Sequence, residues 1–459
     1  MTEPTDKTDS IASLAPWVIA TELVRLRYAD AIDVINSLEI DEAVEVFIHL
    51  PLDYAVDLFD MHELQRASEI MEALPTNLAV DILDGMSADE ATDVFQDMDE
   101  EVRKRLFSML EPVTRHELKT LTLYPENTAG ALMTTEFISV PATWTVERSL
   151  NFIREVERTR ETVYTTYVID PESGILLRDV SLRDLVLAHP SELILEAGRH
   201  QEPVTISPLT ERDDVARLFR RYDLLSVPVV DDEKHVIGIV TVDDVLDVMV
   251  DDMSEDAQKF GGMEAIDEPY MQTSIWEMFK KRGGWLAILL IGEMFTTTAL
   301  QFFDDEFKKA SVLVFFIPLI ISSGGNSGSQ ATSLIIRALA LREVTLRDWW
   351  KIFFRELPTG LILGALLGVI GLVRIIVWQF SGFYDYGPHW FLIAVTIFFT
   401  LIAVVTFGSL TGSLLPFLLK RVGFDPASAS APLVATLVDV SGIVIYFSIA
   451  ALILTGTLL

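Results

Sequence analysis

The stretch PLVATLVDVSGIVIYFSIAALIL, residues 432–454, is an apolar run that carries a single charge, on Asp439. A run of this length is enough for a helix to cross a bilayer. A negative charge in hydrocarbon is costly and usually marks an ion path. Arg337 and Arg374 are the candidate partners from other apolar runs, but they lie near opposite ends of their segments. The stretch therefore predicts a membrane helix whose carboxylate lines a water-filled path for a cation.

Four more apolar segments precede this one and complete a predicted five-helix transmembrane domain. The five lie at about 285–303, 310–341, 357–380, 390–419 and 430–457. Basic residues occur before the first segment, between the second and third, and after the fourth: Lys280, Lys281, Arg282, Arg342, Arg347, Lys351, Arg355, Lys420 and Arg421. By the positive-inside rule, the N-terminus is cytoplasmic and the C-terminus lies outside.

Two of these segments contain further polar groups. Glu293 lies in the first segment, where a protonated carboxyl facing apolar groups or a hydrogen bond to Thr296 or Thr297 would also explain it. In the second segment, GGNSGSQ interrupts an apolar helix and makes Asn326 and Gln330 candidates for a pore or an interface. Helix packing through small residues is the alternative for this run.

The charges are divided unevenly along the chain. Residues 1–279 hold 58 of the 68 acidic residues and 22 of the 35 basic ones, whereas residues 280–459 are close to neutral. Strong acidity excludes nucleic acid as a natural partner and favours cations. The chain has no Cys, which excludes disulfides and thiolate sites. The N-terminus has no basic region followed by an apolar stretch, so no cleavable signal peptide is expected there.

A twelve-residue repeat begins at Ala31, with AIDVI at 31, AVEVF at 43, AVDLF at 55, ASEIM at 67, AVDIL at 79 and ATDVF at 91. Its apolar positions form one helical face, and Pro51, Pro75 and Ser87 are predicted helix starts. Helices of about two turns are marginal alone, so the units are expected to stack into a small α-solenoid. The column of acids in the repeat is interpreted mainly as a solvated face. Asp89 and Asp93 are the better metal candidates, because their i, i+4 spacing places both on one side of a helix.

Short β-rich runs then alternate with amphipathic helices, with YTTYVI at 164, SVPVVD at 226 and VIGIVTV at 236. Two imperfect copies of this pattern resemble a tandem pair of cystathionine-β-synthase-type (CBS) domains. The resemblance implies that ATP or another adenosine nucleotide could be held through Ser181 with Asp184, or through Thr241 with Asp244. The alternative for each pair is a simple helix cap.

An acidic run follows in DVLDVMVDDMSEDAQKFGG, with hardly a basic residue to neutralise it. Helical spacing gathers one group of acids on one side (Asp244, Asp247 and Asp251) and a second group on another (Asp252, Glu255 and Asp256). Divalent cations would relieve the repulsion among these charges. A plain acidic linker is the alternative.

GGNSGSQATSLIIRALA at 324, LRDW at 346, LPFLLKRVGFDPA at 415 and PLVATLVDVSGIVIYF at 432 together resemble the membrane core of the MgtE family of magnesium channels. The resemblance implies a mostly α membrane protein with an acidic helical repeat domain (17–130), tandem CBS domains (131–255), a connecting plug helix (256–282) and a five-helix pore domain (283–459). It also implies a homodimer in a bacterial inner membrane, with Mg²⁺ as substrate and as regulator.

The same resemblance assigns metal roles by position. Asp439 would hold the pore ion and Asp425 would lie at the cytoplasmic mouth. Asp89 and Asp93 would face the acids of the second CBS domain and its following helix: Asp223, Asp244, Asp247, Asp252, Glu255 and Asp256.

Two alternatives differ in function. An intramembrane zinc protease would need an HExxH pair, but His62-Glu63 and His116-Glu117 lack the second His, so no enzyme is predicted. A transporter of another divalent cation, Co²⁺ or Ca²⁺, is the closer rival, because oxygen ligands alone discriminate poorly between such ions.

Overall fold

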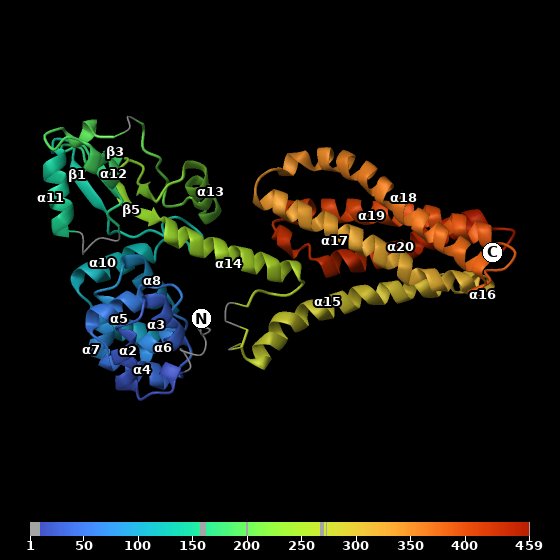
Figure 1. The fold of residues 1–459 in the computed structure, drawn as a ribbon, viewed down its shortest axis with the longest axis horizontal. Coiled ribbons are helices and arrows are strands. Elements are labelled where there is room, and N and C mark those ends of the chain that lie inside the picture. The colour runs from blue at the N-terminus through green and yellow to red at the C-terminus, as the bar shows by residue number, and fades with distance from the viewer. Residues whose placement is uncertain (1–9, 157–161, 199–200, 267–269, 272, 459) are drawn as a thin grey trace. The chain divides into compact units, whose positions relative to one another are not determined.

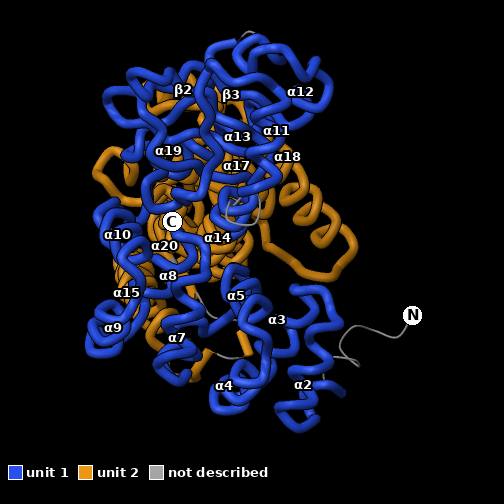
Figure 2. The backbone as a smooth tube through the Cα atoms, turned by 90° about the vertical axis from the view of Figure 1, so that its left-hand side faces the viewer, with its two compact units in different colours: residues 1–250 blue, residues 251–459 orange. Residues whose placement is uncertain are grey.

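The structure is a computed structural model that describes residues 10–156, 162–198, 201–266, 270–271 and 273–458. The chain forms two compact units, residues 1–250 and 251–459 (Figure 2). The division falls inside the last helix of the second CBS-like domain, five residues before the boundary predicted from the sequence.

The first part of unit 1 is a run of short helices (Figure 1). They are α2 (Pro16–Leu23), α3 (Tyr28–Asn36), α4 (Ile40–His49), α5 (Leu52–Phe59), α6 (Ala67–Ala73), α7 (Thr76–Leu83), α8 (Ala88–Asp97), α9 (Glu100–Phe107) and α10 (Pro112–Leu121). Their first residues follow the twelve-residue period, except in α6, which begins three residues late. The period extends beyond the six predicted units to α2, α9 and α10, where the small-residue and acid pattern is lost. Pro51, Pro75 and Ser87 directly precede α5, α7 and α8, so these helices start where predicted.

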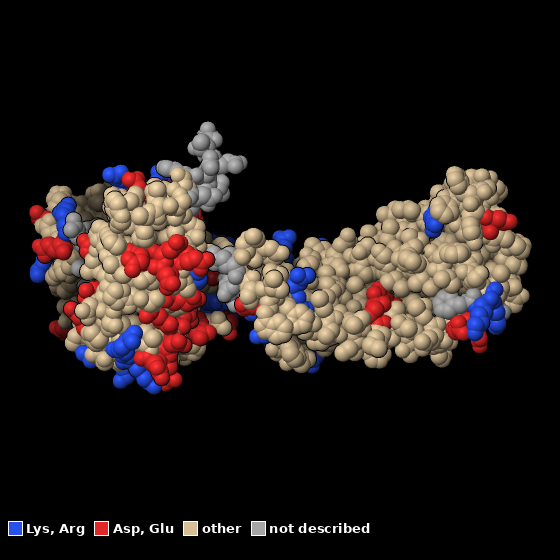
Figure 3. All heavy atoms as spheres, turned by 90° about the horizontal axis from the view of Figure 1, so that it is seen from below, with Lys and Arg blue, Asp and Glu red and all other residues tan. Residues whose placement is uncertain are grey.

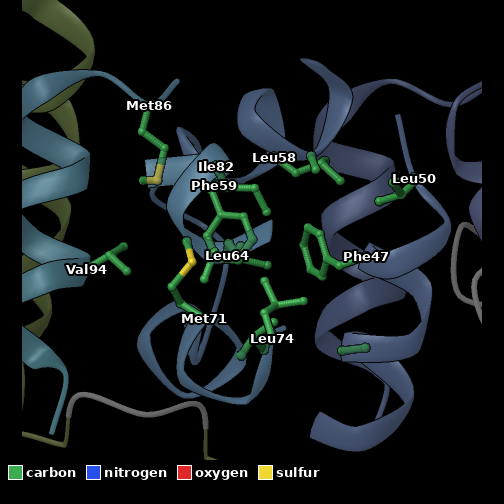
Figure 4. Packing of buried hydrophobic residues seen from close by; sticks show 14 of the residues in the cluster. Phe47, Leu50, Leu58, Phe59, Leu64, Met71, Leu74, Ile82, Met86 and Val94 are labelled. Atoms are coloured by element: carbon green, nitrogen blue, oxygen red, sulfur yellow. The ribbon is translucent and has the colours of Figure 1, made fainter. Parts of the chain in front are cut away.

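Alternate helices of this run pack against one another: α2 on α4, α4 on α6 and α6 on α8, with α3, α5, α7 and α9 forming the second series. Between the two series lies a continuous apolar core, in which Phe47, Phe59, Leu64 and Met71 point toward one another (Figure 4). Each two-turn helix therefore buries its stripe against neighbours two positions away. This arrangement confirms the predicted α-solenoid.

A second column of polar residues, not recognised in the sequence, ties the solenoid together. Asp60, Glu72 and Asp84 recur every twelve residues, and each accepts a hydrogen bond from the main-chain N–H that begins a helix 27 residues further on. The donors are the N–H groups of Ser87, Asp99 and Glu111. A carboxylate at a helix start satisfies an orphan donor and complements the helix dipole. These acids therefore have a structural role, separate from the solvated column.

We expect Asp84→Ala to destabilise α10, because Asp84 accepts from the N–H of Glu111 at 2.9 Å. Loss of such a cap costs about 1 kcal/mol, which should speed hydrogen exchange of the α10 amides about fivefold. Asp81→Ala is the matched control, since Asp81 lies in the solvated column and is exposed. Equal exchange in the two variants would show that Asp84 does not cap α10.

The CBS-like part of unit 1 consists of two similar halves. In the first, β1 (Ile138–Pro141) pairs in parallel with β2 (Thr165–Ile169), which pairs antiparallel with β3 (Leu176–Ser181). Helices α11 (Val146–Val156) and α12 (Leu182–Leu187) and the short helix η2 (Ile194–Glu196) complete this half.

The second half repeats the first. Its β4 (Ser226–Val230) pairs antiparallel with β5 (Val236–Thr241), and a parallel bridge between Ile206 and Val229 takes the place of β1. Its helices are α13 (Arg212–Tyr222) and α14 (Val242–Phe260). This repetition confirms two copies of one module. Helix α14 passes unbroken through residue 256, so the predicted connecting helix of 256–282 is not one element.

Within its described residues, unit 2 has five helices long and apolar enough to cross a membrane, over 275–302, 311–340, 346–381, 390–422 and 431–454. Its elements are α15 (Ile275–Phe302), α16 (Asp304–Lys309), η3 (Ser311–Phe316), α17 (Ile317–Ala340), η4 (Leu346–Asp348), α18 (Trp349–Ser381), α19 (Trp390–Val422), η5 (Pro426–Ser428) and α20 (Ala431–Leu454). On the face shown in Figure 3, acids crowd over unit 1, whereas most of the surface of unit 2 is uncharged.

Glycines allow α17 and α19 to pack backbone to backbone. A Cβ on Gly408 would lie 2.3 Å from the carbonyl oxygen of Gly324, and one on Gly412 would lie 2.1 Å from that of Gly328. Thr332 adds a hydrogen bond from its hydroxyl to the Gly412 carbonyl at 2.8 Å. The small residues of the GGNSGSQ run therefore serve helix packing.

Candidate functional site

An acidic cluster forms where helix α8 of the solenoid approaches α14. Glu90 and Asp93 lie close enough to Asp244 for their charges to interact, and Asp247 also acts on Glu90. The sequence predicted that Asp93 would face Asp244, and these two residues do come together. It missed Glu90, which lies on the same face as Asp93 at i, i+3 spacing and could have been found from that spacing.

The cluster opens into a shallow cleft of about 330 Å³, lined by Glu90, Asp93, Asp97 and Glu126, with His62 and Arg66 at its edge. The sequence analysis did not identify Asp97, Glu126 or His62. Asp97 follows Asp93 by four residues on the same helix face, so its spacing carried a signal. Glu126 lies outside the repeat, so only the fold brings it to the cleft.

The carboxylates of this cluster are held at high pKa by their surroundings. The pKa of Glu90 is raised to about 9, mainly because burial removes water from its carboxyl group. The nearby charges of Asp93 and Asp244 add to this effect. Displacement of water and the charge of Asp97 raise the pKa of Asp93 to about 6. The pKa of Asp244 also rises to about 6, chiefly by burial and against the hydrogen bond from Thr241. The ionised cluster is therefore electrostatically frustrated without a counter-ion.

Two further acids were predicted for this site, Asp89 and Asp223. Asp89 on α8 is almost fully buried, with 8% of its surface exposed. Asp223 is exposed and ends α13 in the left-handed conformation, with φ of 51°. A short acid tolerates that conformation, which gives Asp223 a structural role at a helix end.

The acids in the C-terminal half of α14, Asp252, Glu255 and Asp256, belong to unit 2. Burial and then the charge of Asp425 raise the pKa of Asp256 to about 6, and Asp252 and Glu255 add to the effect. From the sequence, these acids were expected to face Asp93 of unit 1, and that expectation stays a prediction.

A lysine occupies the position expected for a cation at Asp425. The Lys259 Nζ lies 2.6 Å from Asp425 Oδ2 and 2.5 Å from Glu255 Oε1. Burial opposes the charge of Lys259, but the hydrogen bonds to Asp425 and Glu255 outweigh it and raise the pKa of Lys259. This ion pair was not predicted, because Lys259 stands almost alone among the acids of the run.

The predicted nucleotide residues already bond to each other. The Ser181 hydroxyl donates to Asp184 at 2.7 Å, and the Thr241 hydroxyl donates to Asp244 at 2.5 Å. Ser181 also accepts from the N–H of Asp184 and thereby caps α12. These bonds correspond to the helix-cap alternative.

In the membrane helices, Asp439 has a carboxyl partner rather than an arginine. The Asp439 and Glu293 carboxyl groups lie close enough for their charges to interact, where α20 contacts α15. Arg337 lies 3.8 Å from Glu343, and Arg374 stacks at 4.0 Å on the Trp378 ring. Among the described residues, the hydroxyl of Thr296, one of the partners considered for Glu293, has no hydrogen-bond partner.

Polar residues also follow one face of α17. Ser322, Asn326 and Gln330 recur every four residues and are exposed, while Gly324 and Gly328 pack on α19. The Asn326 amide donates to the Ser322 hydroxyl at 3.4 Å. Polar groups facing lipid are costly, so this face requires water or protein beside it.

Comparison with known proteins tests the resemblance seen in the sequence. Three family models match the chain. The MgtE model, described as a divalent cation transporter, matches residues 317–449. The model of the MgtE intracellular N domain matches residues 26–127, and the CBS domain model matches residues 199–251. The magnesium transporter MgtE of Thermus thermophilus is 41% identical over 351 residues, which cover 76% of this chain and 75% of that protein. The chain belongs to the MgtE family.

Two solved structures are also similar to this MgtE chain. A crystal structure of the soluble part of a magnesium transporter is 28% identical, with a TM-score of 0.50, and covers 55% of this chain and 99% of that one. The cytosolic domain of the Mg²⁺ channel MgtE in complex with ATP is 34% identical, with a TM-score of 0.47, and covers 50% of this chain and 94% of that one. The MgtE matches confirm the predicted architecture, and with the five apolar helices they identify a multi-pass membrane protein.

Proposed function

We propose that this MgtE chain carries Mg²⁺ across a bacterial inner membrane through a path lined by Asp439. The observation that carries the proposal is the carboxyl group of Asp439 within an apolar membrane helix, with a second carboxyl group, Glu293, as its partner. Two acidic groups together offer only oxygen ligands, which Mg²⁺ prefers. The name of the Thermus thermophilus relative supports Mg²⁺ as the cargo.

The path would be completed by a second copy of the chain. The exposed polar face of α17, formed by Ser322, Asn326 and Gln330, would be satisfied by water in a path between two subunits. Helix α15 is also largely uncovered, with 6% of its apolar window buried. A homodimer with Asp439 from both copies facing one axis accounts for both features.

The distribution of basic residues supports a cytoplasmic position for unit 1. Lys280, Lys281 and Arg282 lie near the start of α15, and Lys420 and Arg421 lie in the last turn of α19. Arg342, Arg347, Lys351 and Arg355 flank the junction of α17 and α18. In an antiparallel bundle these ends share one side of the membrane, which the positive-inside rule makes cytoplasmic.

Regulation by cytoplasmic Mg²⁺ is proposed for two sites. The first is the cleft cluster of Glu90, Asp93, Asp244 and Asp247, and the second is the group of Asp252, Glu255, Asp256 and Asp425 around Lys259. Both offer oxygen ligands without thiolates, which fits Mg²⁺. Mg²⁺ would bind more tightly to the state in which the acids are close together than to the state in which they are apart. This difference in affinity would favour the first state.

Binding at the cleft should depend on pH. The raised pKa values of Asp93 and Asp244, about 6, and of Glu90, about 9, mean that the compact cluster is most stable below about pH 4 and is weakened as pH rises through 6 toward 9. Mg²⁺ needs the deprotonated carboxylates, so its protective effect should be larger at pH 8 than at pH 6. Hydrogen exchange of the α8 amides, with and without Mg²⁺ at both pH values, measures this. Equal protection at the two pH values would contradict the assignment.

Nucleotide binding through Thr241 and Asp244 stays a prediction. A nucleotide would have to compete with the Thr241–Asp244 hydrogen bond and with the acids that surround Asp244. Fluorescent ATP analogue binding to the full chain, compared with Thr241→Val, would test it.

Rescue of a magnesium-auxotrophic bacterium tests the transport function. Growth at low external Mg²⁺ should depend on the chain. Competition of Mg²⁺ uptake by Co²⁺ or Ca²⁺ would separate the proposal from its rival, a transporter of another divalent cation. Rescue by Co²⁺ or Ca²⁺ transport without Mg²⁺ uptake would overturn the choice of Mg²⁺.

A further inference from the structure

Helix α15 is longer than the hydrocarbon core that it crosses. Its 28 residues span about 42 Å, whereas the core of a bilayer is about 30 Å thick. Its apolar stretch begins near Trp285, and when residues 285–302 cross the core, residues 275–284 lie at the level of the lipid headgroups. The Ser274 hydroxyl accepts from the N–H of Glu277 at 3.1 Å and starts the helix there, so this first segment is helical before it reaches the core.

Protein covers one side of this first segment. The Lys281 carbonyl accepts from the N–H of Glu264 at 3.0 Å. A Cβ on Gly262 would lie 2.8 Å from Nε1 of Trp285, one turn further along the helix. The chain just after α14 therefore packs against the side of α15 that carries Lys281 and Trp285.

Large apolar side chains occupy the other side and are open in the part of the chain that the structure describes. Ile275 is 89% exposed, Trp276 64% and Phe279 60%. The rings of Trp276 and Phe279 stack, with their centroids 5.3 Å apart. An exposed apolar patch of this kind marks a membrane or protein interaction site, and tryptophan is favoured at the headgroup level of a membrane.

Basic residues continue directly from the aromatic pair. Lys280, Lys281 and Arg282 follow Phe279, and Glu277 is the one acid in the sequence 275–284. The Lys280 ammonium lies 5.8 Å from the centre of the Trp276 ring, so positive charge and aromatic surface are adjacent. A helix with aromatic side chains and excess positive charge at headgroup level suits anionic lipids.

We propose that residues 275–282, the first turns of α15, are a binding surface for anionic phospholipids. The basic groups would pair with headgroup phosphates, and Trp276 and Phe279 would lie against the adjoining acyl chains. A second copy of the chain fits this surface less well, because a two-fold interface would place its three consecutive basic residues against their own copies. The inference depends on the membrane position of α15 and not on the ion that the chain carries.

A single fluorophore can report which lipid lies beside this surface. The chain has no Cys, so Ile275→Cys supplies one thiol for labelling. The labelled full-length chain is reconstituted in phosphatidylcholine vesicles that contain nitroxide-labelled phosphatidylglycerol or nitroxide-labelled phosphatidylcholine. We expect the relative association constant, obtained from quenching, to favour the anionic lipid about tenfold. Equal quenching by the two lipids would overturn the proposal.

Charge variants of the labelled chain test the source of this preference. Lys280→Gln, Lys281→Gln and Arg282→Gln together should bring the ratio of association constants close to one. Lys280→Arg with Lys281→Arg keeps the charges, so the preference for the anionic lipid should remain. A preference that survives the glutamine variant, or disappears in the arginine variant, would show that these charges do not bind the lipid.

Three adjacent basic residues of α9 provide a matched control. Arg103→Gln, Lys104→Gln and Arg105→Gln remove the same charge from unit 1, outside the membrane helices, and should leave the lipid preference unchanged. An equal loss in this control would assign the preference to overall charge and overturn the site. Disulfide formation between two copies of unlabelled Ile275→Cys, without a preference for the anionic lipid, would assign the surface to a subunit interface instead.

Discussion

Asp439→Asn is expected to reduce Mg²⁺ uptake by about 100-fold or more while the protein still folds and inserts. The substitution keeps the size of the side chain but removes its negative charge, the one charge in the apolar run 432–454. Removing one partner of a desolvated charge interaction costs roughly 3–5 kcal/mol, which accounts for an effect of this size. Uptake of Mg²⁺ into vesicles, normalised to the amount of folded transporter, measures it.

Asp385→Asn is the matched control for this experiment. Asp385 also lies in unit 2, but it belongs to the turn between α18 and α19, where its oxygen accepts from the Gly387 N–H at 2.9 Å and from the Gln379 amide at 2.8 Å. Asparagine keeps an acceptor oxygen there, so uptake should remain near the wild-type rate. Wild-type uptake by Asp439→Asn would remove Asp439 from the ion path, and equal losses in both variants would point to a general effect of charge.

The architecture could be predicted from the sequence because its signals are local. The twelve-residue period fixed the helices of the solenoid, and it failed only at α6, where Asn36 holds the preceding loop through bonds to Glu63 and Gln65. Those bonds join residues 27 and 29 apart, so no local pattern reveals them. The membrane helices were predicted from length and hydropathy, although α15 and α18 begin about ten residues before their apolar cores.

The candidate sites were predicted less well, because they depend on which side chains the fold brings together. Spacing alone favoured Asp89 with Asp93, but the fold buries Asp89 almost completely and brings Glu90 close to Asp244 of α14. The Asp425 prediction overlooked Lys259, whose charge is offset by acids close to it in sequence. Glu293 and Asp439 lie 146 residues apart in the chain, so neither helix pattern reveals that the fold brings them close together.

Neutralising the cleft cluster is expected to abolish the response of transport to internal Mg²⁺. In the variant Asp93→Asn, Asp244→Asn, Asp247→Asn, the side chains keep their size, but three anionic groups that surround Glu90 are lost. Without these charges, Mg²⁺ binds equally well to the compact state and to the state in which the acids are apart. Its binding then cannot shift the equilibrium between the two states. The ratio of uptake at low and high internal Mg²⁺ should approach one.

The control must change the net charge of unit 1 by the same amount at positions away from the cleft. Asp33→Asn, Glu45→Gln and Asp81→Asn satisfy this, because all three residues lie exposed in the solvated column of the solenoid. Exposed charges interact weakly and are screened by salt, so this variant should keep its response to Mg²⁺. A response that persists in the cleft variant would show that the cleft is not the sensor. A response lost equally in the control would assign regulation to the overall charge of unit 1. The reason is that both variants remove three acidic charges from unit 1, and only a local site would respond to one variant and not to the other.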